Sequence, residues 1–284
     1  MTIKEKNQVV YQLAYNYLID ILPNKLNADK LQKYFSGDRR DFSSLADVYE
    51  QLIYSAQNYQ RMPNVIKFTE RKEKIKSILC EYDLTKITTY NIEDLYQVFR
   101  KEFNVTSEDS KRNSWHKWSK SIIDAAKFMS DFENISDFKT FVNQFDYNLP
   151  SRMALPLLIS TKISGIGFAL ACDFLKELGY VNYPKPDVHL IDVFNRLGLS
   201  ERNPVSVFEA IVKMSDDCKE IDKSITPYKI DKIIWLICSG NFYHDEITNV
   251  KHKEDFITMA ADHLDKIDDS WEFYPSNRMT VCED

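Results

Sequence analysis

Two short segments in the second half of the chain contain the residues best suited to chemistry. Gly165 and Gly167 flank a single residue and are two of only six glycines in the sequence. The segment Asp187-Val188-His189 follows about twenty residues later. Glycines let a backbone approach a phosphate closely, and the free amides that open a helix attract anions. A fixed carboxylate stabilises a developing positive charge or orients an attacking water.

Helices must position both segments. An apolar stretch, residues 155–159, precedes the glycines, and an amphipathic stretch, residues 168–178, follows them. This pattern predicts a hairpin of two helices joined at the Gly-x-Gly turn, although an ordinary tight turn between helices also favours glycine. Pro184 and Pro186 predict an irregular loop over residues 180–187, because proline disrupts regular structure at and before its own position.

The rest of the chain shows helical periodicity almost throughout, and no stretch is typical of a strand. Apolar residues recur at helical spacing in residues 10–21 (ended by Pro23), 44–56, 92–99 (after Asn91), 122–129 and 227–237 (after Thr226). The fold class predicted is therefore all-α.

Composition sets limits on the partners of the chain. The net charge is −6, but residues 251–284 alone contain four basic and nine acidic side chains. The remaining body is nearly neutral, so charge neither indicates nor excludes nucleic acid. No apolar run approaches the roughly 20 residues that cross a bilayer, and residues 1–7 are polar and are not followed by an apolar region or a small-residue cleavage site. We expect a cytoplasmic protein without a membrane partner.

Metal and disulfide chemistry find little support. The five cysteines are scattered without a Cys-x-x-Cys pair, and the histidines lack the spacing of metal ligands. We expect no metal, no disulfide framework and no other cofactor.

Taken together, the two chemical segments resemble the helix-hairpin-helix DNA glycosylase superfamily, which includes endonuclease III-like and alkyladenine glycosylases. In that family an apolar-Gly-x-Gly hairpin is followed, roughly twenty residues later, by an Asp-x-His motif and a helix resembling Asn-Arg-Leu-Gly. Gly165-Ile166-Gly167, Asp187-Val188-His189 and Asn195-Arg196-Leu197-Gly198 match in order and spacing.

The resemblance implies a fold of two helical lobes with a central cleft. One lobe would comprise residues 45–185 and end in the hairpin, and the other would combine residues 1–44 with 186–284. It also implies that the chain, as a monomer, binds double-stranded DNA, extrudes a damaged or modified base and cuts its N-glycosidic bond with Asp187. The simpler alternative for Asp187 is a helix N-cap, and both roles can coexist.

The same resemblance nominates residues that contact DNA. Gly165, Gly167, Ala169 and Lys162 would lie at the hairpin. The segment Leu52-Ile53-Tyr54-Ser55-Ala56-Gln57 resembles a family helix end whose glutamine fills the gap left by the extruded base. Gln57 would be that plug, with Asn58 as the other candidate; a polar helix end explains the segment equally well.

Bifunctional members of the family place a lysine nucleophile two residues after the second hairpin glycine. Ala169 occupies that position here, and Lys162 precedes the turn. A further departure is Ser164, where the family often has proline, and the four-cysteine cluster of some relatives is missing. The resemblance therefore implies a monofunctional enzyme that leaves an intact abasic site.

Aromatic residues supply candidates for a base pocket. Trp115 and Trp118 lie within the basic segment 111–120, where they could stack on a base or anchor a helix core; we favour the core for one of them. Further pocket candidates are Tyr54, Tyr59, Tyr180 and Tyr183, and Trp235 is expected in the core.

Three neighbouring residues receive structural expectations. Asp192 is expected to pair with Arg196 four residues on, and Asp173 is expected to be a solvated helix residue. A packing or hydrogen-bonding role is expected for His189.

The substrate is not determined by these motifs. Alkylated purines are the default expectation from monofunctional relatives. A hypermodified phage base such as glucosylated hydroxymethylcytosine, excised in anti-phage defence, is a second possibility, because residues 1–44 and the missing cysteine cluster suggest a specialised branch. A non-enzymatic helix-hairpin-helix DNA-binding module is the alternative from a different class.

Overall fold

The computed structural model describes residues 1–36 and 42–272, and helices dominate it. The helices are α1 (Ile3–Asp20), α2 (Ala28–Phe35), α3 (Leu45–Gln57), α4 (Met62–Ile66), α5 (Phe68–Ile78), α6 (Leu84–Ile87), α7 (Ile92–Glu102), α8 (Ser114–Met129), α9 (Ile135–Phe145), α10 (Leu149–Lys162), α11 (Phe168–Glu177), α12 (Val188–Arg196), α13 (Pro204–Cys218), α14 (Pro227–Ser239) and α15 (Lys253–Glu272), with short 3-10 turns η1 (Cys80–Tyr82) and η2 (Tyr243–Asp245).

The expected all-α class is confirmed, with one small addition. Residues Asn241–Phe242 (β1) and Ile247–Thr248 (β2) pair as a short antiparallel ribbon around η2. Two residues per strand are too few to produce a readable alternation of apolar and polar side chains. Residues 273–284 of the acidic tail lie outside the described residues.

Local sequence signals explain where several helices begin. The Ser44 side chain accepts a hydrogen bond from the amide of Asp47 at the start of α3. The Asn91 side chain caps α7 through the amide of Glu93. Thr226 caps α14, whose first residue is a proline. Each of these caps satisfies an amide that has no partner inside its own helix.

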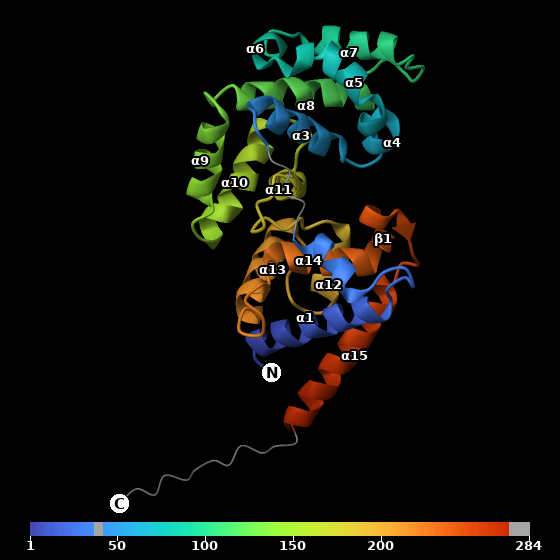
Figure 1. The fold of residues 1–284 in the computed structure, drawn as a ribbon, viewed down its shortest axis with the longest axis vertical. Coiled ribbons are helices and arrows are strands. Elements are labelled where there is room, and N and C mark those ends of the chain that lie inside the picture. Colours follow the sequence, from blue (N-terminus) through green and yellow to red (C-terminus); the bar gives the residue numbers. More distant parts are fainter. Residues whose placement is uncertain (37–41, 273–284) are drawn as a thin grey trace, which may run out of the picture.

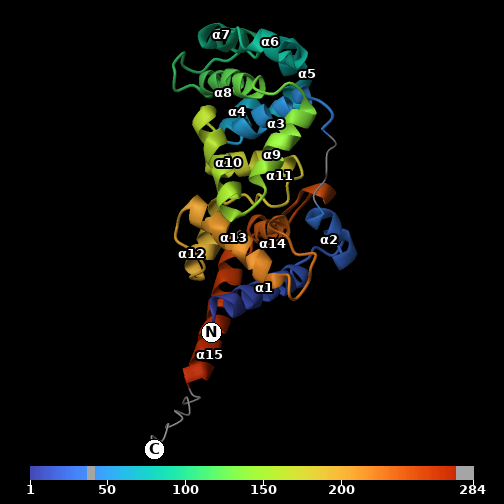
Figure 2. The same ribbon diagram turned by 90° about the vertical axis from the view of Figure 1, so that its left-hand side faces the viewer.

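The helices form two lobes that follow each other along the long axis of the molecule (Figures 1 and 2). The upper lobe contains α3 to α11, and the lower lobe contains α1, α2 and α12 to α15. Each lobe has its own cluster of buried apolar side chains. Helix α13 contributes to both clusters, because Phe208 and Val212 pack in the upper one while Ile211 packs in the lower one.

Chain connectivity makes the lower lobe discontinuous. Helix α1 packs against α13, α14 and α15, which come from the opposite end of the sequence. Helix α11 lies nearest the lower lobe and is followed directly by the loop that leads to α12 (Figure 1). The chain therefore passes from the upper to the lower lobe at this junction, through the loop between α11 and α12. Across the described ranges, no helix is both long and apolar enough to cross a membrane.

Candidate active site at the junction of two lobes

The glycine hairpin joins α10 to α11 and is anchored on α8. Gly165 has a φ of +82°, a conformation that favours glycine, and a Cβ at this position would lie 2.9 Å from Ser121 Oγ. The Ser121 hydroxyl donates a hydrogen bond to the carbonyl of Ser164 (2.6 Å). The amide of Ser164 donates in turn to Asp124 Oδ2 (3.1 Å). Two polar side chains of α8 thus hold the turn in place.

Helix α11 opens without a side-chain cap. Its N-cap residue is Gly167, and a Cβ built there would meet nothing within 4 Å. Among the described residues, the amides of residues 167–170 have no hydrogen-bond acceptor. Unpaired amides at a helix start, without a side chain in the way, suit an anion such as a phosphate.

Cationic side chains lie close to this opening. Lys162 is exposed at the end of α10, and Ala169 is half-buried in the first turn of α11. A pocket of about 210 Å³ adjoins the turn; its lining residues are Ala56, Tyr59, Met62, Lys117, Lys120, Ser121, Ser164 and Gly165. Two lysines therefore line the pocket beside the turn, while Lys162 adjoins a separate pocket that also contains Asp131 and Asp137.

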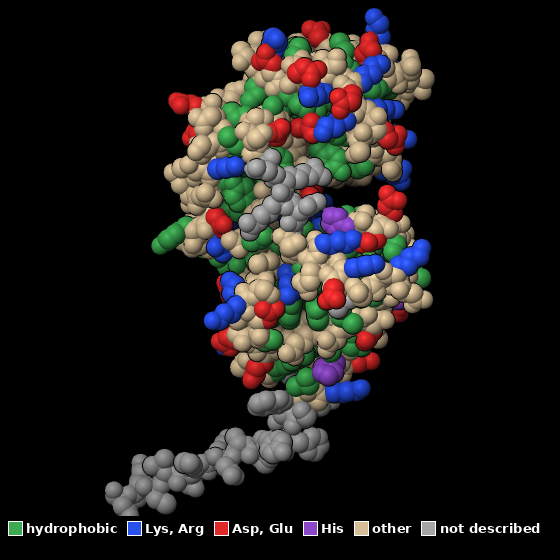
Figure 3. All heavy atoms as spheres, viewed as in Figure 1, with side chains coloured by type: hydrophobic (Ala, Val, Ile, Leu, Met, Phe, Trp, Pro, Cys, Tyr) green, Lys and Arg blue, Asp and Glu red, His purple; other side chains and the backbone are tan. Residues whose placement is uncertain are grey.

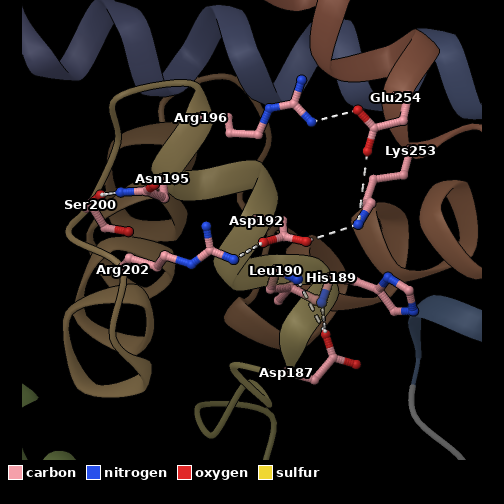
Figure 4. A network of polar contacts seen from close by, with 10 residues as sticks. All are labelled: Asp187, His189, Leu190, Asp192, Asn195, Arg196, Ser200, Arg202, Lys253 and Glu254. Atoms are coloured by element: carbon pink, nitrogen blue, oxygen red, sulfur yellow. Dashed lines mark hydrogen bonds and ion pairs between the residues drawn. The ribbon is translucent and has the colours of Figure 1, made fainter.

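Asp187 caps the start of α12 (Figure 4). Its Oδ1 accepts hydrogen bonds from the amides of His189 (2.8 Å) and Leu190 (3.2 Å). Its Oδ2 points away from the helix start in Figure 4 and has no hydrogen-bond partner within residues 1–36 and 42–272. The N-cap role expected for Asp187 is thus present, and it leaves one carboxylate oxygen available.

The surroundings of Asp187 disfavour its negative charge. Burial and the neighbouring carboxylate of Asp231 raise the pKa of Asp187 above its ordinary value. The charge of Lys185, the amide of Leu190 and the His189 side chain oppose that shift only in part. A carboxylate that is poorly solvated, with a like charge nearby, gains more from a positive group than one in water does.

A buried ion cluster lies beside Asp187. Asp231 on α14 is 1% exposed; it accepts hydrogen bonds from Lys176 Nζ (3.2 Å) and from the amide of Lys185 (2.7 Å). The Nζ atoms of Lys176 and Lys185 lie 3.7 and 3.2 Å from Asp173 Oδ1. These four residues link α11, α14 and the loop before Asp187.

The expectation that Asp173 is solvated was wrong, because this residue is only 6% exposed. Asp173 and Lys176 lie one turn apart on one face of α11. Asn58 at the end of α3, Lys185 of the loop before α12 and Asp231 of α14 contact that face. Burial alone raises the pKa of Asp173, but the charges of Lys185 and Lys176 outweigh it and hold that pKa below its ordinary value. A helical wheel without tertiary contacts gives no sign of this burial.

Asn58 and Gln57 have different environments. Gln57 is 4% exposed, and its side-chain oxygen accepts a hydrogen bond from the amide of Phe68 (3.3 Å). Its side chain therefore holds the first residue of α5 inside the upper lobe. The prediction that Gln57 lies at a DNA-contacting surface was wrong. Asn58 is half-buried and donates to Asp173 Oδ2 (3.4 Å). Of the two plug candidates, only Asn58 lies at the junction.

The tryptophans of α8 belong to the upper core. Trp118 is fully buried and donates its indole N–H to the carbonyl of Ile53 (2.9 Å). Trp115 is 1% exposed and stacks on Phe103 with ring centroids 4.9 Å apart. Neither ring presents a face to the surface, so the core alternative is correct for both of them.

The tyrosine candidates differ in exposure. Tyr183 is fully buried, and its hydroxyl has no hydrogen-bond partner in the described parts of the chain. Tyr54 and Tyr180 are half-buried, Tyr54 against the ring of Phe68. Tyr59 is partly exposed beside the hairpin pocket. Tyr59 is therefore the most accessible of the four.

The predicted pair of Asp192 with Arg196 was wrong. Asp192 binds Arg202 (3.0 Å) and Lys253 (2.8 Å), and Arg196 binds Glu254 instead (Figure 4). The start of α15 lies across α12 and offers closer partners than the same helix does. The pairs with Lys253 and Glu254 connect α12 to α15, and Arg202 connects α12 to the loop that follows it.

The residues that sequence reasoning missed are Asp231, Lys176 and Lys185. Asp231 adjoins the apolar stretch of α14, where a charged side chain is normally assumed to face water. A run of helical periodicity cannot tell which polar positions a second lobe will cover. Figure 3 shows the surface indented between the lobes at its right edge, with charged side chains of both signs around the indentation.

Comparisons with known proteins give one structural likeness. No family model matches the chain, and no curated protein matches it. A solved structure of the Methanocaldococcus jannaschii 8-oxoguanine glycosylase/lyase, in complex with 15mer DNA containing 8-oxoguanine, is similar with 17% identity and a TM-score of 0.48. The match covers 79% of this chain and 96% of that one. The similar protein is a DNA glycosylase, the class that the sequence motifs resemble, but such an identity and score assign no activity to this chain.

Proposed function

We propose that this chain is a DNA glycosylase that hydrolyses the N-glycosidic bond of an extruded base. The observation that carries the proposal is the state of Asp187. One of its oxygens is held by two amides, the other has no hydrogen-bond partner among the described residues, and burial with Asp231 raises its pKa. A structural N-cap gains nothing from such an unfavourable charge environment, whereas a catalytic carboxylate does.

The proposed chemistry follows from this geometry. The base departs with the electron pair of the C1′–N bond and takes up a proton from solvent, which leaves positive charge on the sugar; the ionised carboxylate of Asp187 stabilises that charge. The free oxygen orients the water that attacks the sugar and accepts its proton. The two amide hydrogen bonds keep the carboxylate in one orientation, so little reorganisation is needed during the reaction.

DNA binding is assigned to the opening of α11. The unpaired amides of residues 167–170 would hold one phosphate, and Lys162 with the pocket lysines Lys117 and Lys120 would add attraction to the backbone. Asn58, next to the exposed Tyr59, would enter the gap left by the extruded base. The proposed partner is double-stranded DNA, and we propose that the chain binds it as a monomer. One lobe of that monomer would comprise residues 45–185, and the other would combine residues 1–44 with 186–284.

We further propose that strand cleavage is absent. Ala169 offers no amine where bifunctional relatives have their lysine. The lysines deeper along the same face, Lys176 and Lys185, are held in ion pairs with Asp173 and Asp231. An ion-paired ammonium is a poor nucleophile because it holds its proton.

The test is base release from a panel of duplexes carrying alkylated purines, 8-oxoguanine, uracil or glucosylated hydroxymethylcytosine. Each duplex is incubated with the wild type or Asp187→Asn and then heated in alkali, which breaks abasic sites. Alkali-dependent cuts that the variant loses would support the proposal and name the base. Release of glucosylated hydroxymethylcytosine would also favour a role in anti-phage defence.

Two results would contradict the proposal. Cuts without alkali would show a lyase nucleophile, and the monofunctional assignment would fall. Tight binding to every duplex without base release would leave a non-enzymatic helix-hairpin-helix DNA-binding module.

A further inference from the structure

Lys232 on α14 is enclosed by aromatic rings. Its Nζ lies 5.4 Å from the ring centroid of Tyr228, 5.6 Å from that of Trp235 and 4.9 Å from that of Tyr243. The whole residue is only 6% exposed. We call these four residues the lysine cage. Three ring faces around one ammonium stabilise its charge without a hydrogen bond.

The N–H groups of the Lys232 ammonium have no acceptor among the described residues. Across residues 1–36 and 42–272 it makes no hydrogen bond and no ion pair. Lys229, one turn earlier and 7% exposed, also lies over two rings but binds Asp222 (3.3 Å) and Ser224 (3.4 Å). Burying an ammonium donor without an acceptor is unfavourable, so such a group is typical of a place that a ligand completes.

The lysine cage lies close to the proposed catalytic carboxylate. Asp231 immediately precedes Lys232 on α14, and its Oδ2 accepts a hydrogen bond from the amide of Lys185 (2.7 Å), two residues before Asp187. The negative charge of Asp231 acts to raise the pKa of both Asp187 and Lys232. Trp235 is half-buried and Tyr243 is 37% exposed, so the cage reaches the surface through these two rings.

Charged neighbours from two further elements set the state of the amine. Burial and then Lys176 on α11 lower the pKa of Lys232 to about 8, while the carboxylates of Asp231, Glu177 and Asp173 act to raise it. Tyr243 from η2 contributes a neutral phenol, because burial raises its pKa to about 12. The amine is therefore mainly cationic at neutral pH.

We propose that the lysine cage is the base-recognition subsite of this enzyme, and that it selects a neutral base with a carbonyl or hydroxyl oxygen at its edge while rejecting cationic alkylated purines. This inference rests on the proposed glycosylase function. It favours oxidised or hydroxyl-bearing bases over N7-alkylguanine and N3-alkyladenine, the default expectation from monofunctional relatives.

Two physical reasons support this selection. An oxygen acceptor on the base would satisfy the unpaired donors of Lys232, and a site built around a hydrogen bond discriminates strongly against ligands that lack it. A cationic base would gain little cation–π stabilisation, because the ring faces already contact the ammonium of Lys232. That ammonium would also repel it.

The experiment compares single-turnover release of 7-methylguanine, whose nucleotide in DNA is cationic although it keeps the O6 acceptor, with release of 8-oxoguanine and glucosylated hydroxymethylcytosine, which are neutral. The wild type is compared with Lys232→Met and with the control Lys229→Met on the same helix. We expect the wild type to prefer a neutral base by about tenfold or more. Lys232→Met should lose about tenfold on that base and none on 7-methylguanine, while Lys229→Met keeps the wild-type ratio.

The folding of Lys232→Met is measured separately from its base release. Lys232→Met loses the cation–π contacts but also removes a buried ammonium without an acceptor, so it should fold and melt close to the wild type, and circular dichroism checks this. Faster release of 7-methylguanine than of every neutral base by the wild type would overturn the inference, as would an unchanged ratio in folded Lys232→Met.

A binding assay separates this inference from the proposed function. Duplexes carry 2′-fluoro sugars, which resist cleavage, with either 8-oxoguanine or guanine. Suppose that the wild type releases no base in the release assay but binds the 2′-fluoro duplex with 8-oxoguanine more tightly than the one with guanine. If Lys232→Met loses that binding preference, the proposed glycosylase function is wrong and the proposed subsite is supported. If the wild type releases no base and shows no preference, both fail.

Discussion

Helices α11 and α12 both begin at the lobe junction, yet their first turns are used in opposite ways. Helix α11 begins at Gly167, which has no side chain to cap the amides and leaves them open. Helix α12 begins at Asp187, whose carboxylate occupies two of the corresponding amides. The same positive helix end therefore offers a site for an external anion in one case and holds an internal anion in the other.

The electrostatic surroundings sharpen this difference. Lysines line the pocket beside the turn before α11, whereas the start of α12 faces the buried carboxylate of Asp231. One end should attract a phosphate, and the other should repel it while favouring a positive sugar. The contrast shows how two helix starts in one molecule can divide binding from chemistry.

The largest effect on base release is expected from a change at the start of α12. Asp187→Asn keeps a capping oxygen for the amides of His189 and Leu190 but removes the negative charge. We expect base release to fall by about 10³-fold, with DNA affinity retained, because the charge and not the cap stabilises the sugar. Single-turnover base release together with a binding titration measures both. Loss of binding in proportion to activity would mean that Asp187 has only a structural role.

A second change tests the acidic surroundings of α12. Asp231→Asn leaves the buried ammonium of Lys176 without its nearest carboxylate (3.2 Å), and we expect a loss of about 3 kcal/mol in the free energy of unfolding. Asp216→Asn is the matched control, because Asp216 and its partner Lys219 are both largely exposed and such pairs contribute about 1 kcal/mol or less. Urea unfolding of both variants is the measurement. Equal losses would show that the buried cluster does not hold the junction together.

The third change closes the open end of α11. Gly167→Ala adds a Cβ that meets no atom of the chain within 4 Å, so stability should stay within about 0.5 kcal/mol. The methyl group would stand where a phosphate approaches, and we expect DNA affinity to drop by about tenfold at moderate salt.

Gly165→Ala is its counterpart, because the φ of +82° and the contact with Ser121 make the strain internal. It should cost about 1–2 kcal/mol of stability. Fluorescence anisotropy and thermal melts distinguish the two variants. A loss of stability without a loss of affinity in Gly167→Ala would contradict the open-end assignment.

The smallest expected effect concerns the pH dependence of stability. The pKa of Asp187 is raised in the folded state, so the folded chain holds this proton more tightly than the unfolded chain does. That contribution is present below the ordinary pKa and is lost as pH rises through the raised value. Asp187→Asn should therefore be the more stable protein at neutral pH, and the difference should shrink at acid pH. Melting curves across this range would refute the assignment if the wild type were the more stable at neutral pH.

Much of the local structure was predictable from short-range signals. The starts of α3, α7 and α14 follow from Ser44, Asn91 and Thr226, because a cap acts within three residues of its own position. The position of Asp187 at a helix start was predictable for the same reason. Gln57 shows where such reasoning stops: its helix end was foreseeable, but the amide of Phe68 that engages its side chain was not.

The sequence by itself determined the all-α class, the glycine turn and the aspartate that begins α12, since these depend on backbone preferences and on neighbours a few residues apart. Only the tertiary structure decided that Asp173, Lys176 and Asp231 are buried together and that Lys232 lies in a cage of rings. It also decided that Trp115 and Trp118 are core residues. Burial depends on which surfaces of two lobes meet, and residues far apart in the chain set that contact.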